Sequence, residues 1–194
     1  ALDDEHVGIV LADVADKGFH AALFMAVSRT LFLQDGKHSL SPAQVALAVH
    51  RGMMDVSATD DIFVTAFYGV LHRPRGRLTY VRAAQERPLL YHPGTDVRAL
   101  TGDGRFLGMF DELELEEDTI WLQPGDRLII FSDGVPDAVN PAGVRYGYER
   151  LHAALETGGH FSAPHLVQHI VADLDRFSLD AAPFDDVTLL VVAT

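Results

Sequence analysis

The chain has 194 residues, of which 48% are hydrophobic and 22% charged, and this composition is typical of a globular protein. Its formal net charge of -13 argues against nucleic acid and anionic membrane surfaces as partners, because both require clustered Lys and Arg. The absence of cysteine excludes disulfides and thiolate metal sites, and no apolar run approaches the ~20 residues that span a bilayer. With no secretory signal at its start, the sequence predicts a cytoplasmic protein.

The first half of the chain predicts a strand, two helices and a group of strands. The apolar run 7–12 predicts a buried strand that ends in the acidic turn 13–18. A helix is expected over 19–33, with apolar residues on more than one face, and Ser41-Pro42 begins a second helix with preferred N-cap and N1 residues. The β-branched and aromatic segments that follow predict an antiparallel meander over 63–71, 78–81 and 89–92.

The second half predicts three strands and two helices. A glycine-rich stretch at 101–108 interrupts the pattern. Strands are expected over 119–122, 127–131 and 187–192, and helices over 148–155 and 164–177. Because the helices group near the two ends with strands between them, the pattern indicates an α+β fold rather than alternating βαβ units. No repeat or linker is visible, so we expect a single domain over 1–194.

Three aspartates stand where an apolar strand meets a turn. Asp13 and Asp133 each follow such a strand, and Asp185 precedes one. Carboxylate ligands without cysteine favour Mg²⁺ or Mn²⁺, and two such ions can activate water for phosphoryl transfer. Any one of these turns could equally be a helix cap or an Asx-turn, but three together favour a shared metal site. The negative net charge is consistent with such a site or with an acidic surface that keeps the protein soluble.

The order and spacing of the motifs point to a known family. The segments that carry the likeness run almost from end to end: ADVADKG (12–18), AALFM (21–25), FVTAFYGVL (63–71), LQPGDRL (122–128), SDGV (132–135), YG (146–147) and DDVTL (185–189). Together they resemble the metal-dependent protein serine/threonine phosphatases of the PPM (type 2C) superfamily, in the bacterial SpoIIE/RsbU-like branch. No single segment would be specific enough.

The resemblance implies a fold and a site. The fold is a four-layer α/β/β/α sandwich of two antiparallel sheets flanked by helices. The site holds two divalent cations, Mn²⁺ or Mg²⁺, and water attacks a phosphoserine or phosphothreonine. The implied metal ligands are Asp13, which bridges the ions, the backbone carbonyl of Val14, Asp133 and Asp185. Supporting positions are Gly18 and Gly134, which allow close backbone approach, and Asp186, which stands beside a ligand.

Two departures from the family pattern affect the expected chemistry. The pattern has a further acidic Gly-Asp turn on a strand before position 1, so one metal-ligand Asp is missing from this sequence and we expect Asp3 and Asp4 to be turn residues. Either the sequence begins after that strand, or the protein lacks this ligand. The family usually has Gly-His-Asn where this chain has Ala84-Gln85-Glu86. That change either alters substrate handling or is neutral loop variation.

The leading hypothesis is therefore an enzyme that hydrolyses a phosphoserine or phosphothreonine on a regulatory partner protein. The family implies a partner of the anti-sigma-factor-antagonist type, an upstream sensor domain and a homodimer as further expectations. A catalytically degenerate module that only binds a phosphoprotein is the alternative, which the missing ligand and the altered turn favour. Retained, mutually repelling carboxylates argue against it. A two-metal phosphoesterase acting on small molecules shares the chemistry but not the matched motifs.

Overall fold

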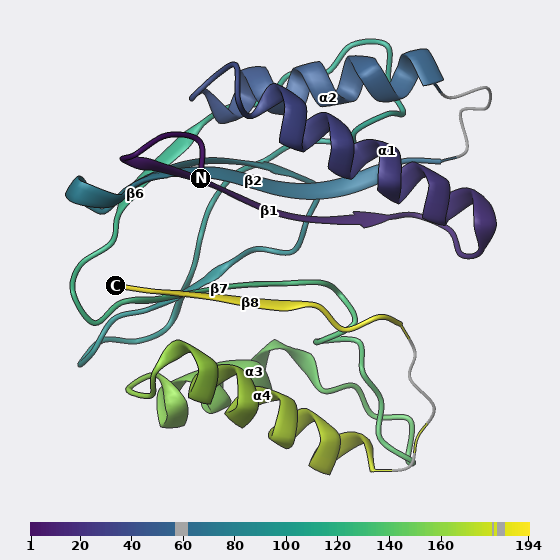
Figure 1. The fold of residues 1–194 in the computed structure, drawn as a ribbon. Helices are drawn as coiled ribbons and strands as arrows, with labels where there is room; N and C mark the ends of the chain where they lie inside the picture. The colour runs from purple at the N-terminus through teal and green to yellow at the C-terminus, as the bar shows by residue number, and fades with distance from the viewer. Residues whose placement is uncertain (57–61, 180, 182–184) are drawn as a thin grey trace. The chain divides into compact units, whose positions relative to one another are not determined.

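The computed structural model describes residues 1–56, 62–179, 181 and 185–194. These residues form two compact units, each built on one four-stranded antiparallel sheet (Figure 1). The first unit comprises Ala1–Gln85 and Thr101–Leu122, and the second comprises Glu86–Leu100 and Gln123–Thr194.

In the first unit, two helices cover one face of the sheet (Figure 1). The sheet has the order β1-β2-β3-β6, with bounds His6–Val14, Val64–His72, Arg77–Ala83 and Asp118–Trp121. The helices are α1 (Phe19–Asp35) and α2 (Pro42–Val56). A short 3₁₀ turn, η1 (Arg73–Arg75), joins β2 to β3. Burial of apolar side chains between helices and sheet is the main stabilising term, and the buried set includes Phe32, Val45, Val49, Met53, Val64, Tyr68, Val81 and Leu107.

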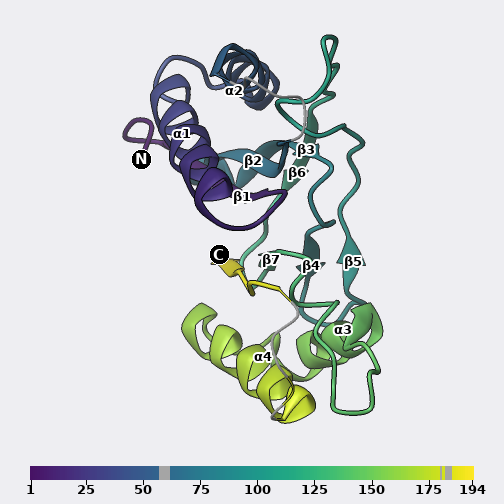
Figure 2. The ribbon, with the colours of Figure 1, turned by 90° about the vertical axis from the view of Figure 1, so that its right-hand side faces the viewer.

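In the second unit, two helices likewise pack on one face of the sheet (Figure 2). The sheet has the order β5-β4-β7-β8, with bounds Arg98–Ala99, Leu89–Tyr91, Arg127–Phe131 and Leu189–Ala193. The helices are α3 (Gly147–Gly158) and α4 (Ala163–Ser178). Their inward faces meet the sheet in a core that includes Leu89, Ile129, Phe131, Leu151, Leu155, Leu166 and Ile170.

The expected α+β class, with two antiparallel sheets flanked by helices, is confirmed. The second helix begins as predicted, since the Gln44 backbone N–H donates to the Ser41 hydroxyl at 3.2 Å. The expected turn at Asp3 is also present, and its carboxylate accepts from the backbone N–H groups of Glu5 and His6. Among the described residues, no helix is both long and apolar enough to cross a bilayer.

Three expectations about the strands are wrong. The first strand does not end at residue 12, because Asp13 and Val14 continue the antiparallel pairing with β2. The last strand begins at Leu189 rather than at 187. The predicted meander breaks after β3: Ala84 adopts a left-handed conformation with φ 56°, which turns the chain away, and β4 then pairs with β5 and β7.

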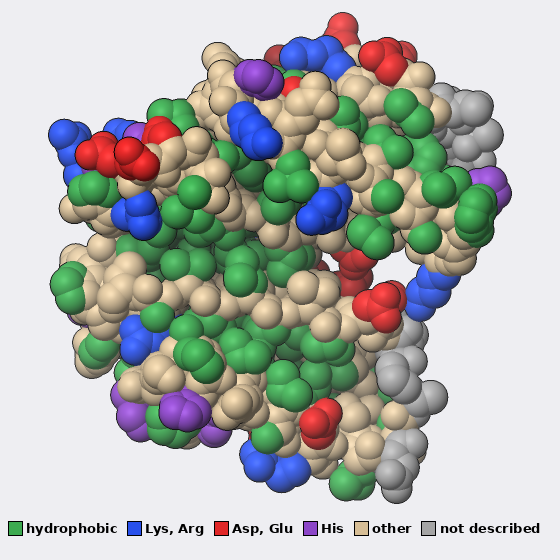
Figure 3. Space-filling view, viewed as in Figure 1, with side chains coloured by type: hydrophobic (Ala, Val, Ile, Leu, Met, Phe, Trp, Pro, Cys, Tyr) green, Lys and Arg blue, Asp and Glu red, His purple; other side chains and the backbone are tan. Residues whose placement is uncertain are grey.

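Helix α1 is more exposed than its apolar composition suggests. The sequence pattern, with apolar residues on more than one face, predicts extensive packing against the sheet. Ala21, Ser28 and Phe32 are its buried residues. Its exposed apolar side chains include Phe19, Leu23, Met25 and Leu33. Figure 3 shows hydrophobic side chains scattered over the surface of the upper part of the view.

An ion-pair network fastens α3 to α4. Arg150 donates to both Asp173 oxygens, at 2.9 Å and 3.1 Å, and the Tyr146 hydroxyl donates to the same carboxylate at 2.9 Å. The hydrogen bonds from Arg150 are the main cause that lowers the pKa of Asp173, to about 2. The charged carboxylate therefore stabilises the folded protein at neutral pH.

Asp173→Asn should lower the free energy of unfolding by about 1–2 kcal/mol at pH 7, because it removes the charge from a carboxylate that is only 18% exposed and accepts hydrogen bonds from Arg150 and Tyr146. The folded-state pKa lies below the unfolded value, so the contribution is complete above about pH 4 and disappears as the pH falls through about 2. Urea unfolding at several pH values measures this difference. Asp175→Asn on the exposed face of α4 is the control, and an equal loss in both variants would contradict the prediction.

Candidate metal centre

The second unit brings two of the predicted ligand segments to one edge of its sheet, the edge where β7 ends and β8 begins. Strand β7 pairs with β8 up to Phe131 and Leu189. Beyond that pair, the Ser132 backbone N–H donates to the Thr188 carbonyl at 3.0 Å. Asp133 follows Ser132 just beyond the end of β7, and the segment before β8 carries Asp185. Antiparallel pairing therefore places both aspartates at the same end of adjacent strands.

Ser132 fastens the two segments together through its side chain. Its hydroxyl donates to the Asp186 carbonyl at 3.0 Å and accepts from the Thr188 backbone N–H at 2.9 Å. The side chain is buried, so these hydrogen bonds form away from competing water. Sequence reasoning did not identify Ser132 as a positioning residue. Its place inside the Ser-Asp-Gly-Val motif, one residue before the predicted ligand, was the available signal.

Gly134 lets the same two segments approach closely. A Cβ atom at this position would lie 2.2 Å from the Asp186 carbonyl oxygen and 2.8 Å from the Asp186 carbonyl carbon. Contacts under 3.0 Å are essentially never made by real Cβ atoms. Only glycine therefore permits the observed separation between the turn after β7 and the chain before β8.

The charges at this edge repel one another. Burial raises the pKa of the Asp133 carboxyl, and the charges of Asp185 and Asp137 raise it further. Asp137 is paired with Arg145 at 2.7 Å. Two carboxylates held in mutual repulsion fit a hard divalent cation, which would offset their charge and favour their ionised forms. The two predicted ligands of the second unit, Asp133 and Asp185, therefore suit the predicted metal.

The remaining predicted residues lie in the first unit. Asp13 is half-buried and stands opposite Thr65 in the β1–β2 pair, with Val14 opposite Val64. Gly18 precedes α1 with φ 93°, a left-handed conformation that glycine adopts without strain. The Thr65 hydroxyl donates to the Gln85 side-chain oxygen at 2.7 Å. This hydrogen bond connects the altered Ala84-Gln85-Glu86 turn to the β1–β2 pair.

The structure thus gathers Asp133, Asp185 and Asp186 within one unit, and it holds Asp13 and Val14 within the other. Among the described residues, no three His, Asp or Glu side chains form a group ready to hold a metal. The ligand set of Asp13, Val14, Asp133 and Asp185 therefore stays a prediction.

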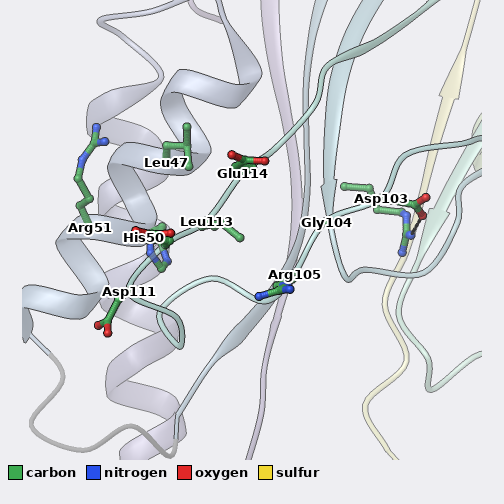
Figure 4. Close-up of a pocket in the computed structure, with 11 residues that line it drawn as sticks. Leu47, His50, Arg51, Asp103, Gly104, Arg105, Asp111, Leu113 and Glu114 are labelled. Atoms are coloured by element: carbon green, nitrogen blue, oxygen red, sulfur yellow. Dashed lines mark hydrogen bonds and ion pairs between the residues drawn. The ribbon is translucent and has the colours of Figure 1, made fainter.

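A hollow in the first unit is separate from these residues. It is lined by α2, by Arg82 of β3 and by the loop that follows β5, and its residues include His50, Arg51, Asp103, Arg105 and Asp111 (Figure 4). Several of its charges are already engaged. Arg82 donates to the Gly102 and Gln85 carbonyls and pairs with Asp103, while Arg105 lies over the Phe110 ring. None of the predicted metal ligands lines this hollow.

Comparison with known proteins decides the family. Residues 3–194 match the family described as Stage II sporulation protein E, SpoIIE. The chain belongs to the SpoIIE family. The PPM-type resemblance of its motifs is thereby confirmed, in the SpoIIE/RsbU-like branch.

Two curated relatives are 28% identical in sequence to this SpoIIE family chain. Protein IcfG of Synechocystis sp. aligns over 218 residues, which cover 98% of the chain and 34% of that protein. Phosphoserine phosphatase RsbU of Bacillus subtilis aligns over 194 residues, which cover 98% of the chain and 56% of that protein. The chain thus spans between about a third and just over half of these relatives.

Solved structures show the same fold as this SpoIIE family chain. The SiaA-PP2C domain of Pseudomonas aeruginosa superposes with a TM-score of 0.89 at 21% identity, covering 99% of the chain and 77% of that structure. RsbX in complex with magnesium superposes with a TM-score of 0.68 at 17% identity, covering 97% of the chain and 81% of that structure. At these identities the likeness establishes the fold alone.

Proposed function

We propose that this chain is a metal-dependent protein serine/threonine phosphatase domain. It hydrolyses a phosphoserine or phosphothreonine on a regulatory partner protein, of the anti-sigma-factor-antagonist type. The observation that carries the proposal is the convergence of Asp133 and Asp185 at one sheet edge, in a chain that matches the SpoIIE family from residue 3 to residue 194. The relative named phosphoserine phosphatase RsbU supports the reaction class.

The proposed ligands are Asp13, the Val14 carbonyl, Asp133 and Asp185, which is the set that the family resemblance implies. When bound, two Mn²⁺ or Mg²⁺ ions supply Lewis-acid activation of water and neutralise charge on the phosphoryl group. The RsbX structure with magnesium supports a divalent cation in this fold.

The protein's own contribution is to hold the carboxylates in place. Ser132 and Gly134 keep the Asp133 turn against the Asp185–Asp186 segment. A fixed carboxylate pair avoids the cost of reorganising flexible side chains around each ion, and this preorganisation is how an active site lowers a reaction barrier. We infer that Asp186 acts through its backbone carbonyl, which accepts from Ser132, rather than as a ligand.

Mn²⁺ titration of the full-length protein by calorimetry tests the proposal, with turnover of p-nitrophenyl phosphate followed in parallel. We expect binding of two ions and turnover that depends on Mn²⁺. A protein that binds no Mn²⁺ and shows no turnover, yet still binds a phosphorylated peptide, would instead be the degenerate binding module. Preferential hydrolysis of a small phosphate metabolite over a phosphopeptide would indicate a phosphoesterase of another kind.

A further inference from the structure

Three adjacent strands of the second unit end at the edge that carries the proposed ligands. Strand β7 leads to Asp133, and β8 follows Asp185. Strand β4 lies on the other side of β7, with Leu89 opposite Ile129. Because the pairing is antiparallel, the residues before Leu89 run toward the Phe131 end of β7. The third strand therefore delivers Glu86 to the same edge.

Tyr148, near the start of α3, holds Glu86 there. The Tyr148 hydroxyl donates to Glu86 Oε2, and the Tyr148 ring meets the Phe131 ring edge-on at a centroid distance of 6.3 Å. Phe131 is fully buried at the end of β7, so the Tyr148 ring packs against a side chain that is fixed in the core. Burial raises the pKa of the Tyr148 hydroxyl, as do Glu86, Asp137 and Asp133. The phenol thus stays protonated and keeps donating at neutral pH.

Strand pairing gives the surroundings of Glu86, since it brings the residues before β4 and the residues after β7 to the same edge. The charges of Asp133 and Asp137 accordingly raise the pKa of the tyrosine that Glu86 contacts. Arg145 is already paired with Asp137. The Glu86 bond to Tyr148 uses Oε2, and among the described residues Oε1 accepts no hydrogen bond. Glu86 therefore presents an oriented, half-buried negative charge beside the proposed reaction site.

We propose that Glu86 is a specificity-determining residue, which selects phosphorylated segments that carry a Lys or Arg next to the phosphorylated residue. This inference rests on the proposed function and deepens it. A carboxylate fixed beside the site repels the phosphate dianion and any acidic neighbour in the substrate. A basic neighbour reverses that effect, because its ammonium or guanidinium group can donate to Glu86. The residue thus sets the charge pattern that the site accepts.

The preference is measurable as a ratio of affinities. The full-length protein is titrated with labelled peptides that contain a phosphonate analogue of phosphoserine, which cannot be hydrolysed, flanked by Lys or by Ala. Fluorescence anisotropy gives both dissociation constants. An accessible ion pair of this kind should favour the Lys peptide by about three- to fivefold at low ionic strength. The ratio should fall toward one as salt is added.

Variants connect the preference to Glu86. In Glu86→Gln the ratio should fall to about one, and Tyr148→Phe should reduce it in part by releasing the carboxylate. Glu156→Gln removes an equal charge from the exposed surface of α3 and should keep the full ratio. A merely structural role for Glu86 would weaken both peptides equally and leave the ratio intact.

An unchanged ratio in Glu86→Gln would overturn the inference. With unchanged Mn²⁺ binding, that result would show that another group reads the neighbouring charge. With weakened Mn²⁺ binding in calorimetry, it would show that the carboxylate serves the metal. The proposed function is tested separately by the p-nitrophenyl phosphate turnover of the wild-type protein. A Glu86-dependent ratio without turnover would uphold the binding preference and reject the phosphatase.

Discussion

Asp133→Asn should abolish the Mn²⁺-dependent hydrolysis of p-nitrophenyl phosphate by the full-length protein while the fold stays intact. The carboxylate lies two residues after β7 and shares its edge with Asp185. An amide of the same size keeps the shape but loses the charge that binds a hard cation. Loss of even an outer-shell partner of a metal costs about 10–100-fold in activity or affinity, so loss of a ligand should exceed about 100-fold.

The control for this change is Asp175→Asn. Asp175 lies on the exposed face of α4 in the same unit, and its replacement changes the net charge by the same amount. Circular dichroism should show the same helix and strand content in both variants. Turnover within twofold of the wild type in Asp133→Asn would remove this residue from the site and with it the proposed metal centre.

Asp133→Asn, which should abolish activity, should stabilise the metal-free protein. Burial and the charges of Asp185 and Asp137 raise the pKa of Asp133, which means that its ionised form is disfavoured in the folded chain. A neutral asparagine removes that repulsion. In the presence of a chelator we therefore expect the melting temperature to rise by about 1–2 °C. A lowered melting temperature would show that Asp133 makes stabilising contacts of its own.

Much of this architecture was predictable because local patterns and tertiary packing agree. The segment at 127–131 is a continuous apolar run, and it forms the central strand β7, whose residues 128–131 are fully buried. Ser41-Pro42 combines a side-chain cap with a residue that lacks a backbone N–H, and α2 begins there. Where propensity, periodicity and burial favour the same structure, the sequence pattern alone is sufficient.

The errors occur where partners distant in sequence decide the structure. Asp13 looked like the first residue of a turn, yet its pairing with Thr65, fifty-two positions later, keeps it in β1. The short spacing between β3 and β4 suggested neighbouring strands, but the left-handed conformation of Ala84 separates them. Neither the pairing nor the conformation leaves a periodic signal in the sequence.

The candidate site shows the same division. The motif order predicted that Asp133 and Asp185 share an edge, and β7–β8 pairing brings them there. The residues that support them were harder to identify, because Ser132 acts on a segment more than fifty residues away. The Tyr148–Glu86 contact also joins residues that are far apart in the chain. A contact of this kind depends on side-chain direction, which a one-dimensional pattern does not contain.

Gly134→Ala should weaken Mn²⁺ binding without removing any carboxylate. The added Cβ would stand 2.2 Å from the Asp186 carbonyl oxygen, so the turn after β7 or the segment before β8 must move. Either movement separates Asp133 from Asp185 and disturbs the hydrogen bonds of Ser132. Forcing a methyl group into such a close contact typically costs about 1–3 kcal/mol in the free energy of unfolding. Calorimetry and urea unfolding measure the two effects.

Gly143→Ala is the matched control, since it adds the same methyl group in the same unit. A Cβ at Gly143 meets no atom within 4 Å, although its φ of 75° still makes alanine unfavourable by about 1 kcal/mol. This variant should therefore lose some stability and keep its Mn²⁺ affinity. If Gly134→Ala bound Mn²⁺ as tightly as Gly143→Ala, close backbone packing would not be what holds the two aspartates together. Because both variants keep every carboxylate, a difference between them isolates the geometry of the site from its charge.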